Sequence, residues 1–211
     1  MKYIFDFDDV LFNNTKQFKE HMFKLITEAG VPEAEARAYY AKPEVRGKEF
    51  SLKKFIKTLF STYDVDIKET PVDDIYQRIM QESRKFLNLD LVELAKRVGL
   101  ENCYIVTNGE REFNTDKLKY TGIWDLFGGE KRIQIVPGNK REAILKICAE
   151  PRKEGEKVIF IDDKQTFLNE VKDVPDLISI PYKNQSSEEL MSEINRVITQ
   201  NATSAELKRR K

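Results

Sequence analysis

Residues 2–13 read KYIFDFDDVLFN, an apolar run followed at once by acidic side chains at positions 6, 8 and 9. Continuous Tyr, Ile and Phe bounded by polar residues predicts a buried strand over Tyr3–Phe7. In sheets of parallel strands, ligands bind beyond the carboxyl ends of the strands. The acidic residues stand at such an end, so this segment predicts both the first strand of the fold and the start of its chemistry.

Further apolar runs of similar length follow along the chain. They predict strands over Cys103–Thr107, Val158–Ile161 and Leu177–Ile180, and the less apolar run Arg132–Val136 predicts another. Long helical patterns separate these runs, and runs that are apolar at nearly every position are typical of strands covered on both faces. The sequence therefore predicts an α/β fold: a three-layer, Rossmann-like core with a mainly parallel sheet and right-handed crossovers.

Residues 8–102, between the first predicted strand and Cys103, are too many for one crossover, and about 80 of them show helical spacing with no convincing strand. We expect an inserted helical cap over residues 14–88, between the two parts of the core, residues 1–13 and 89–200. The helices predicted within the cap are Thr15–Ala29, Glu33–Tyr40, Leu52–Thr62 and Val72–Leu87.

The predicted core has its own helices over Leu89–Val98, over Arg141–Glu150 and after Ser187. Residues 201–211 end in Lys208-Arg-Arg-Lys211 and are expected to form a polar, frayed tail.

Composition excludes several classes of protein. Lys and Arg total 36, as do Asp and Glu, so no net charge attracts the chain to nucleic acid or to an anionic membrane. No apolar stretch reaches the length of a membrane span or a signal peptide, and we expect a cytoplasmic protein. Cys103 and Cys148 are too far apart for a metal-binding pair, so we expect both to be buried as small apolar side chains.

The three carboxylates of Asp6, Asp8 and Asp9 would repel one another unless a cation lay among them. Mg²⁺ prefers oxygen ligands and leaves room for a phosphate group. A carboxylate beside such an ion is a nucleophile toward phosphorus, which predicts this role for Asp6. Asp8, two residues on, is placed to protonate the leaving oxygen and then to activate water, provided that its pKa is raised.

Other predicted strand ends carry matching residues. Thr107, followed by Asn108-Gly109, offers a hydroxyl and backbone N–H groups to a phosphoryl oxygen. Lys140 precedes a helix and is suited to neutralise a phosphoryl group. A further strand ends in Asp162 and Asp163, which would supply metal ligands. The lone histidine, His21, lies in an amphipathic helical pattern and is interpreted as structural.

Taken in this order, the segments FDFDDVL (residues 5–11), IVTN (105–108), Lys140 and IDD (161–163) resemble the four motifs of the haloacid dehalogenase superfamily. The resemblance spans nearly the whole chain. It implies that Asp6 is the nucleophile, Asp8 the acid/base, Thr107 a phosphoryl ligand and Lys140 the stabilising cation. It also implies Mg²⁺ held by Asp6, Asp162, Asp163 and the backbone carbonyl of Asp8, with Asn108 beside the substrate.

The chain departs from the common family pattern at three positions, one of which is Val10, where many members have threonine. Asp9 stands where many members have glycine, and position 167, where an additional acid often follows, is Phe167. Lys131 lies nine residues before Lys140 and is an alternative motif lysine, although Lys140 better suits a helix start.

The insertion resembles the family's mobile helical cap of the C1 type, which closes over the crevice and excludes water. Substrate specificity is expected to reside there. Arg46-Gly-Lys48 forms a basic loop, so Arg46 and Lys48 are candidate ligands for the leaving group or a second anion.

Five readings of the function compete. Dehalogenation is disfavoured because dehalogenases of the family lack an acid at the Asp8 position. A phosphomutase would share every core residue and is the main enzymatic alternative, and a non-catalytic phosphate-binding protein on this fold is also open. A response-regulator receiver is disfavoured because its adjacent acids follow the first strand, whereas here they come last. We expect a hydrolase of a small, sugar- or nucleotide-like phosphomonoester, acting as a monomer or homodimer without nucleic-acid or membrane partners.

Overall fold

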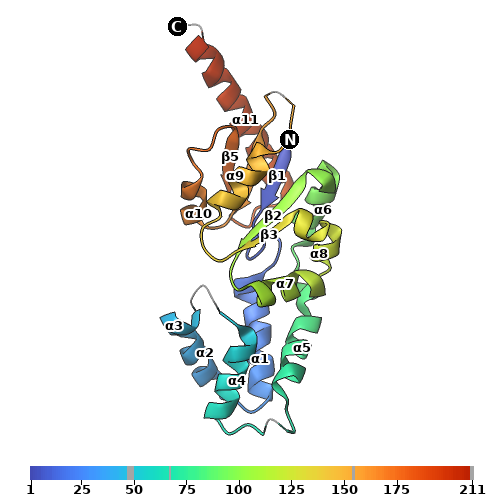
Figure 1. The fold of residues 1–211 in the computed structure, drawn as a ribbon, viewed down its shortest axis with the longest axis vertical. Coiled ribbons are helices and arrows are strands. Elements are labelled where there is room, and N and C mark those ends of the chain that lie inside the picture. Colours follow the sequence, from blue (N-terminus) through green and yellow to red (C-terminus); the bar gives the residue numbers. More distant parts are fainter. Residues whose placement is uncertain (47–49, 67, 154, 210–211) are drawn as a thin grey trace.

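The computed structural model describes residues 1–46, 50–66, 68–153 and 155–209. Its sheet has five parallel strands in the order β3-β2-β1-β4-β5 (Figure 1). The strands are β1 (Lys2–Phe5), β2 (Cys103–Asn108), β3 (Ile133–Val136), β4 (Val158–Asp162) and β5 (Leu177–Pro181). The predicted α/β class with a parallel sheet is confirmed, and β1 lies at the centre of the sheet.

Both faces of the sheet are covered. In β1, Tyr3 and Phe5 pack in one apolar cluster with α6 (Leu89–Val98) and α11 (Ser187–Arg209). Ile4 points the other way, into a second cluster with α9 (Arg141–Ala149) and α10 (Gln165–Glu170). Alternate residues of one strand thus serve two cores, which explains why the strand sequences are apolar at nearly every position.

The remaining helices of the core follow β2. They are α7 (Arg111–Tyr120) and α8 (Ile123–Leu126), and short 3₁₀ turns lie at Leu100–Asn102 and Gly129–Lys131. α7 was not predicted from the sequence, because it is strongly polar and its buried positions include Asn114 and Lys117 as well as Phe113 and Leu118.

The segment between β1 and β2 begins with helices that lie at the end of the molecule opposite α11 (Figure 1). It starts with a π-helical turn (Asn14–Phe18) that continues into α1 (Lys19–Glu28). There follow α2 (Glu33–Ala41), α3 (Pro43–Arg46), α4 (Leu52–Thr62), α5 (Val72–Gln81) and a 3₁₀ turn (Ser83–Phe86). In the described residues the insertion is helical, and its assignment to a particular cap type remains a prediction.

Two predicted helices have different ends in the structure. The helix predicted over Val72–Leu87 stops at Gln81, because the chain turns back toward the core, where Leu87 forms a β-bridge with Phe12. The closing helix does not fray at residue 201 but continues to Arg209. Residues 201–209 contain no Gly or Pro, and five of them, two Ala and one each of Glu, Leu and Lys, favour helix.

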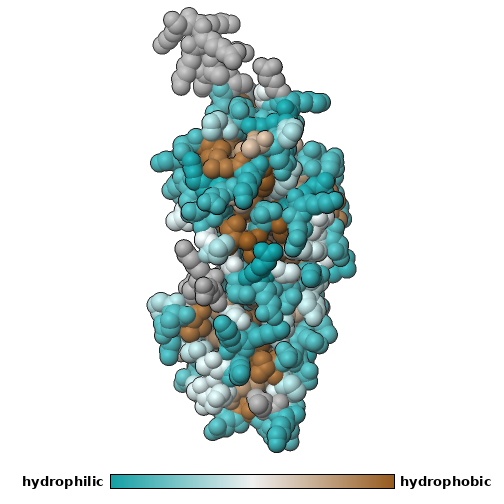
Figure 2. Space-filling view, viewed as in Figure 1, coloured by the Kyte–Doolittle hydropathy of each residue, from teal (hydrophilic) through white to brown (hydrophobic). Residues whose placement is uncertain are grey.

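Most of the face seen in Figure 2 is hydrophilic, with apolar residues in separate small patches. Both cysteines are buried and unpaired, as expected. Among the described residues, every helix is too short or too polar to cross a bilayer.

Candidate active site

The central strands deliver the site residues to one edge of the sheet. β1 lies between β2 and β4, and all three run parallel. Asp6 directly follows β1, Thr107 lies near the end of β2, and Asp162 ends β4. Because the carboxyl ends of parallel strands share an edge, residues about 100 and 160 positions apart meet there.

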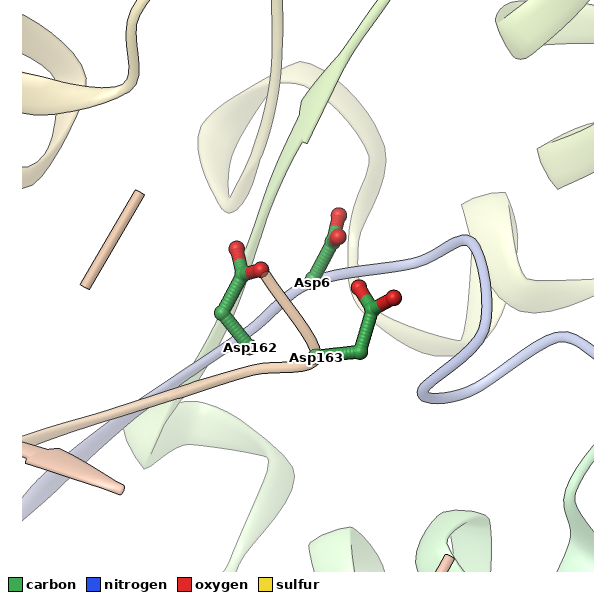
Figure 3. A group of neighbouring side chains, drawn as sticks. All are labelled: Asp6, Asp162 and Asp163. Carbon is green, nitrogen blue, oxygen red and sulfur yellow. The ribbon is translucent and has the colours of Figure 1, made fainter. Parts of the chain in front are cut away.

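Three carboxylates form a compact cluster. Asp6, Asp162 and Asp163 each offer one oxygen, and these oxygens all lie within 4.8 Å of one another. Figure 3 shows the three side chains next to one another with their carboxylates directed to the same side: Asp6 directly after β1, Asp162 at the end of β4 and Asp163 directly after it. Asp6 and Asp162 are almost fully buried, and Oδ1 of Asp163 is buried without a hydrogen-bond partner.

Lys140 is the cation of this cluster. It is fully buried, and its Nζ lies 2.7 Å from Asp6 Oδ1 and 2.6 Å from Asp162 Oδ2. Its position immediately before α9 lets the side chain enter the site. Lys131 is exposed in a 3₁₀ turn, so the structure brings Lys140 and not Lys131 to the carboxylates.

Burial shifts the ionisation of these groups. Loss of hydration raises the pKa of Asp6 from 3.8 to about 6, despite the opposing charge of Lys140. Burial likewise raises the pKa of Asp162 and of Asp163. Burial disfavours the charged form of Lys140, but the carboxylates of Asp6 and Asp162 outweigh this and raise its pKa.

The donor set fits a hard divalent cation. When ionised, the three carboxylates carry three negative charges, and Lys140 compensates for one of them. A divalent cation would balance the remainder, and carboxylate oxygens are the ligands that Mg²⁺ prefers. The unpartnered oxygen of Asp163 is a free position for such an ion.

Thr107 and Asn108 differ in whether their side chains already have hydrogen-bond partners within the protein. The Thr107 side chain is 1% exposed and its hydroxyl has no hydrogen-bond partner, so the group can donate to a ligand oxygen at the strand end. The Asn108 amide already donates to the backbone oxygens of Val136 and Gly138. In the structure, Asn108 therefore fastens the loop after β3 to β2, and it also lines the cavity described below.

Asp8 does not join the acidic cluster. Its two carboxylate oxygens lie 2.6 and 2.7 Å from Nζ of Lys117, a residue of α7 that is 1% exposed. The ammonium group also lies 4.8 Å from the centre of the Phe113 ring and near the rings of Phe7 and Phe12. Sequence reasoning missed Lys117; its only signal was a lysine four residues after Phe113, on the face of a helix that was not predicted.

Asp9 has a different task from its neighbours. Its backbone adopts φ 61°, in the left-handed region that glycine enters without strain. This conformation explains why glycine is suited to the position of Asp9. Its carboxylate accepts hydrogen bonds from the backbone N–H and the hydroxyl of Thr15. Asp9 thus shapes the turn after β1 and starts the chain into the insertion.

A cavity of about 350 Å³ lies where the insertion meets the core, with Asp8 in its wall. The core contributes Asp8, Asn108, Gly109, Glu110, Phe113, Asn114 and Lys117, and the insertion contributes Asn14, Phe18, Lys19, Met22, Tyr40 and Phe50. Of the predicted ligands in the insertion, Lys48 lies outside the described residues. Arg46 ends α3, and its side chain also lies outside them.

Solved structures share the fold at low sequence identity. A haloacid dehalogenase-like hydrolase from Burkholderia xenovorans is 16% identical, with a TM-score of 0.59 over 85% of this chain and 80% of that one. A provisionally named β-phosphoglucomutase from Thermotoga maritima is 15% identical, with a TM-score of 0.52 over 91% of each chain. The HAD-hydrolase YfnB from Bacillus subtilis, solved with magnesium, is 16% identical, with a TM-score of 0.51 over 89% and 90%. No curated protein gives a significant sequence match.

The family assignment comes from the sequence as a whole. The haloacid dehalogenase-like hydrolase family model matches residues 3–166, which include the acidic residues after β1, Thr107, Lys140 and the acidic pair after β4. The match covers well over half of the chain. The chain therefore belongs to the haloacid dehalogenase-like hydrolases.

Proposed function

We propose that the protein hydrolyses phosphomonoesters with Mg²⁺, through a phosphoryl group carried transiently on Asp6. The observation that supports this most is the arrangement around Asp6: a buried carboxylate cluster, one lysine bridging two of its members, and the unpartnered Thr107 hydroxyl in one place. Membership of a hydrolase family also supports hydrolysis, and the magnesium-bound YfnB structure shows that a protein of similar fold binds this ion.

Asp6 is suited to act as the nucleophile. Its contacts with the Phe7 backbone N–H, at 2.7 Å, and with Lys140 both fall on Oδ1. Oδ2 attacks phosphorus, an Asp6 oxygen–phosphorus bond forms, and the bond from phosphorus to the substrate alcohol breaks. Bound Mg²⁺ would neutralise charge on the phosphoryl oxygens and on the carboxylates.

Asp8 handles the proton in both half-reactions. It gives a proton to the leaving alcohol oxygen, then takes one from the water that attacks phosphorus, releasing phosphate and restoring Asp6. Thr107 donates its hydroxyl hydrogen to a phosphoryl oxygen, and Lys140 stabilises the negative charge that the reaction spreads over the site. An acid at position 8 is what distinguishes this proposal from carbon–halogen cleavage, which needs no such proton donor.

The test is phosphate release from a broad panel of phosphomonoesters. Activity should require Mg²⁺, disappear with EDTA and return when Mg²⁺ is added back. Asp6→Asn should lower kcat at least about a thousandfold and Asp8→Asn about a hundredfold or more. Lys131→Met, which alters an exposed lysine, is the control and should retain activity. Phosphate release that survives EDTA or Asp6→Asn would overturn the mechanism.

Phosphomutase activity is the alternative outcome of the same assay. Its basis is the shared fold with the provisionally named β-phosphoglucomutase. Interconversion of hexose phosphates without phosphate release would favour it. Binding of phosphate esters with neither reaction would favour a non-catalytic protein.

A further inference from the structure

The position of Asp8 identifies where the leaving group would lie. Asp8 lines the 350 Å³ cavity between the core and the insertion. On the proposed function, Asp8 protonates the leaving oxygen and must be within hydrogen-bond reach of it. On this basis the alcohol part of the substrate occupies the cavity, and the residues that line the cavity indicate the chemistry of that alcohol.

One side of the cavity is an aromatic wall formed by Phe18, Tyr40, Phe50 and Phe113. Neighbouring rings in it contact each other. The ring centres of Phe18 and Phe113 are 6.1 Å apart, those of Phe113 and Phe50 5.7 Å, and those of Phe50 and Tyr40 5.3 Å. The last two pairs meet at steep angles, 70° and 83°. Lys117 Nζ lies over one face of Phe113 and Lys19 Nζ over one face of Tyr40, at 4.8 and 5.6 Å from the ring centres. The ring faces and edges that these cations leave uncovered are of the kind that hold another flat ring.

The polar groups of the cavity are largely engaged within the protein. The Lys117 ammonium group is held by both oxygens of Asp8, and the Asn108 amide by two backbone oxygens. The Glu110 carboxylate accepts the backbone N–H groups of Glu112 and Phe113 at the start of α7. A sugar would bring several hydroxyl groups here, and each hydroxyl buried without a partner weakens binding.

Asn114 has an acceptor left over. Its side chain is 3% exposed, and its Nδ2 donates to the Glu110 backbone oxygen at 2.9 Å. This bond fixes the orientation of the amide, because the opposite orientation would bring two oxygens together. Oδ1 is then buried without a hydrogen-bond partner, in a residue that lines the cavity, and it is an acceptor that still needs a donor.

We propose that the substrate is the monophosphate of an alcohol that carries an aromatic ring with an N–H or O–H donor on its edge. The ring packs against the aromatic wall, and the donor reaches Asn114 Oδ1. The inference rests on the proposed function for the position of the phosphate, and on the cavity alone for the ring.

The test compares alcohols of similar acidity, so that leaving-group chemistry does not decide the result. With Mg²⁺, kcat/KM for benzyl phosphate should exceed that for cyclohexylmethyl phosphate by about tenfold, and that for glucose 6-phosphate by more. Equal or better turnover of the saturated ester or of the sugar would overturn the proposal. Uridine 5′-monophosphate separates two sources of the ring: faster turnover than benzyl phosphate identifies a nucleobase, and slower turnover a simple aryl alcohol.

Variants locate the preference. Phe50→Leu should reduce the preference for benzyl over cyclohexylmethyl phosphate to less than about threefold, because an apolar side chain remains but its ring is lost. Phe60→Leu alters a buried ring of the insertion that does not line the cavity, and it should keep the preference. An unchanged preference in Phe50→Leu would contradict the aromatic wall as its source.

The donor is tested first on the unaltered protein. One of the hydroxybenzyl phosphates should have a KM at least about fivefold lower than its methoxybenzyl counterpart, because only the hydroxyl can donate to Asn114. Asn114→Leu should bring the KM values of the hydroxybenzyl and methoxybenzyl esters to within about twofold of each other, and this ratio within the variant is the readout. If no hydroxybenzyl isomer is favoured, the donor assignment fails.

Failure of the proposed function is distinguishable from failure of this inference. Dissociation constants for benzyl and cyclohexylmethyl phosphate, measured on Asp6→Asn with Mg²⁺, report the ring preference without turnover. Tighter binding of benzyl phosphate, with no phosphate release by the unaltered protein, would contradict the proposed hydrolysis but support an aromatic ring in the ligand. Equal dissociation constants for the two esters would contradict the preference for an aromatic ring, even if the protein releases phosphate.

Discussion

At the scale of single residues, two buried lysines organise the site. Lys140 bridges Asp6 and Asp162, and Lys117 holds both oxygens of Asp8. Lys140 neutralises charge between two buried carboxylates, and Lys117 neutralises the single, partly exposed carboxylate of Asp8. The proposed nucleophile and the proposed acid/base therefore have separate cationic partners, delivered by different helices, α9 and α7.

Replacing Lys140 tests the first of these pairs. Lys140→Met should lower the free energy of unfolding by about 3 kcal/mol, because Asp6 and Asp162 lose their buried counterion. It should also abolish phosphate release. Denaturant unfolding measures the first effect. Lys131→Met, at an exposed site, should change stability by less than about 0.5 kcal/mol, and an equal loss in the two variants would contradict the assigned role.

Replacing Lys117 tests the second pair. Lys117→Met keeps a long side chain among Phe7, Phe12 and Phe113 but removes the charge that fixes the Asp8 carboxylate. Steady-state kinetics should show kcat lowered about ten- to a hundredfold, with KM changed less than about threefold.

Lys119→Met is the matched control, because Lys119 is an exposed residue of the same helix. It should leave both constants unchanged. A loss confined to KM in Lys117→Met would mean that Lys117 binds substrate and does not position Asp8.

At the scale of elements, the two ends of the helical insertion are tied together. The Asn13 N–H donates to the Phe86 oxygen and the Asn88 N–H to the Leu11 oxygen, both at 2.8 Å. Phe12 stacks on Phe7 at 5.1 Å between ring centres and also contacts the Phe86 ring. The insertion therefore leaves and re-enters the core through one paired crossing beside Asp6 and Asp8.

Asn88 is the residue of this crossing whose loss should be most costly. Its Oδ1 accepts from the Leu91 N–H at the start of α6, and its Nδ2 donates to the Val10 oxygen and to the Tyr182 hydroxyl. Asn88→Ala should lower the free energy of unfolding by about 2–3 kcal/mol, because a helix cap and two partly buried hydrogen bonds are lost together.

Ser51 provides the comparison, since it caps α4 with a single exposed bond of 3.5 Å. Ser51→Ala should cost less than about 1 kcal/mol by the same unfolding measurement. Equal costs for the two caps would show that Asn88 does not secure the crossing.

At the scale of the whole molecule, α7 is the wall shared by core and insertion. Glu112 pairs with Lys53 of α4 at 2.9 Å, and Asp116 accepts from the Tyr76 hydroxyl of α5 at 2.5 Å. The same helix carries Lys117 and lines the cavity. In Figure 1 it lies between the sheet and the helices of the insertion, so packing of the insertion and geometry at Asp8 are linked through one element.

The buried carboxylates make stability depend on pH and on the metal. The pKa of Asp6 is about 6 in the folded chain against an ordinary 3.8, so between these values the folded state binds more protons than the unfolded state. Stability from Asp6 is therefore present at low pH and lost as pH rises through about 6, a change of about 3 kcal/mol without metal. Unfolding of the metal-free protein, compared with Asp6→Asn across this range, isolates the contribution from that of other acids.

Mg²⁺ should reverse the trend, because it favours the ionised carboxylates. The rise in Tm on adding Mg²⁺ should be larger near neutral pH than at about pH 5, where protons compete for the same oxygens. Asp163→Asn should reduce this rise. An increase in Tm that is independent of pH and of Asp163 would place the ion elsewhere.

A feature of the structure could be predicted from the sequence where it depends on neighbouring residues alone. The strands could be predicted because each is a short apolar run with polar ends. The signal for β3 is the weakest of the five, because the polar Gln134 interrupts its apolar run. The acids at strand ends followed directly from this. α7 could not be predicted, because Lys117 is buried only through partners in other segments, and a lysine in isolation indicates a solvated surface.

By itself, the sequence determined the parallel α/β core, the order of its chemical residues and the presence of a helical insertion, because each follows from local periodicity and the geometry of parallel strands. Only the tertiary structure decided between Lys140 and Lys131, paired Asp8 with Lys117, and built the aromatic wall. These features join residues from different segments, and their energies depend on burial and charge that arise only when those segments pack together.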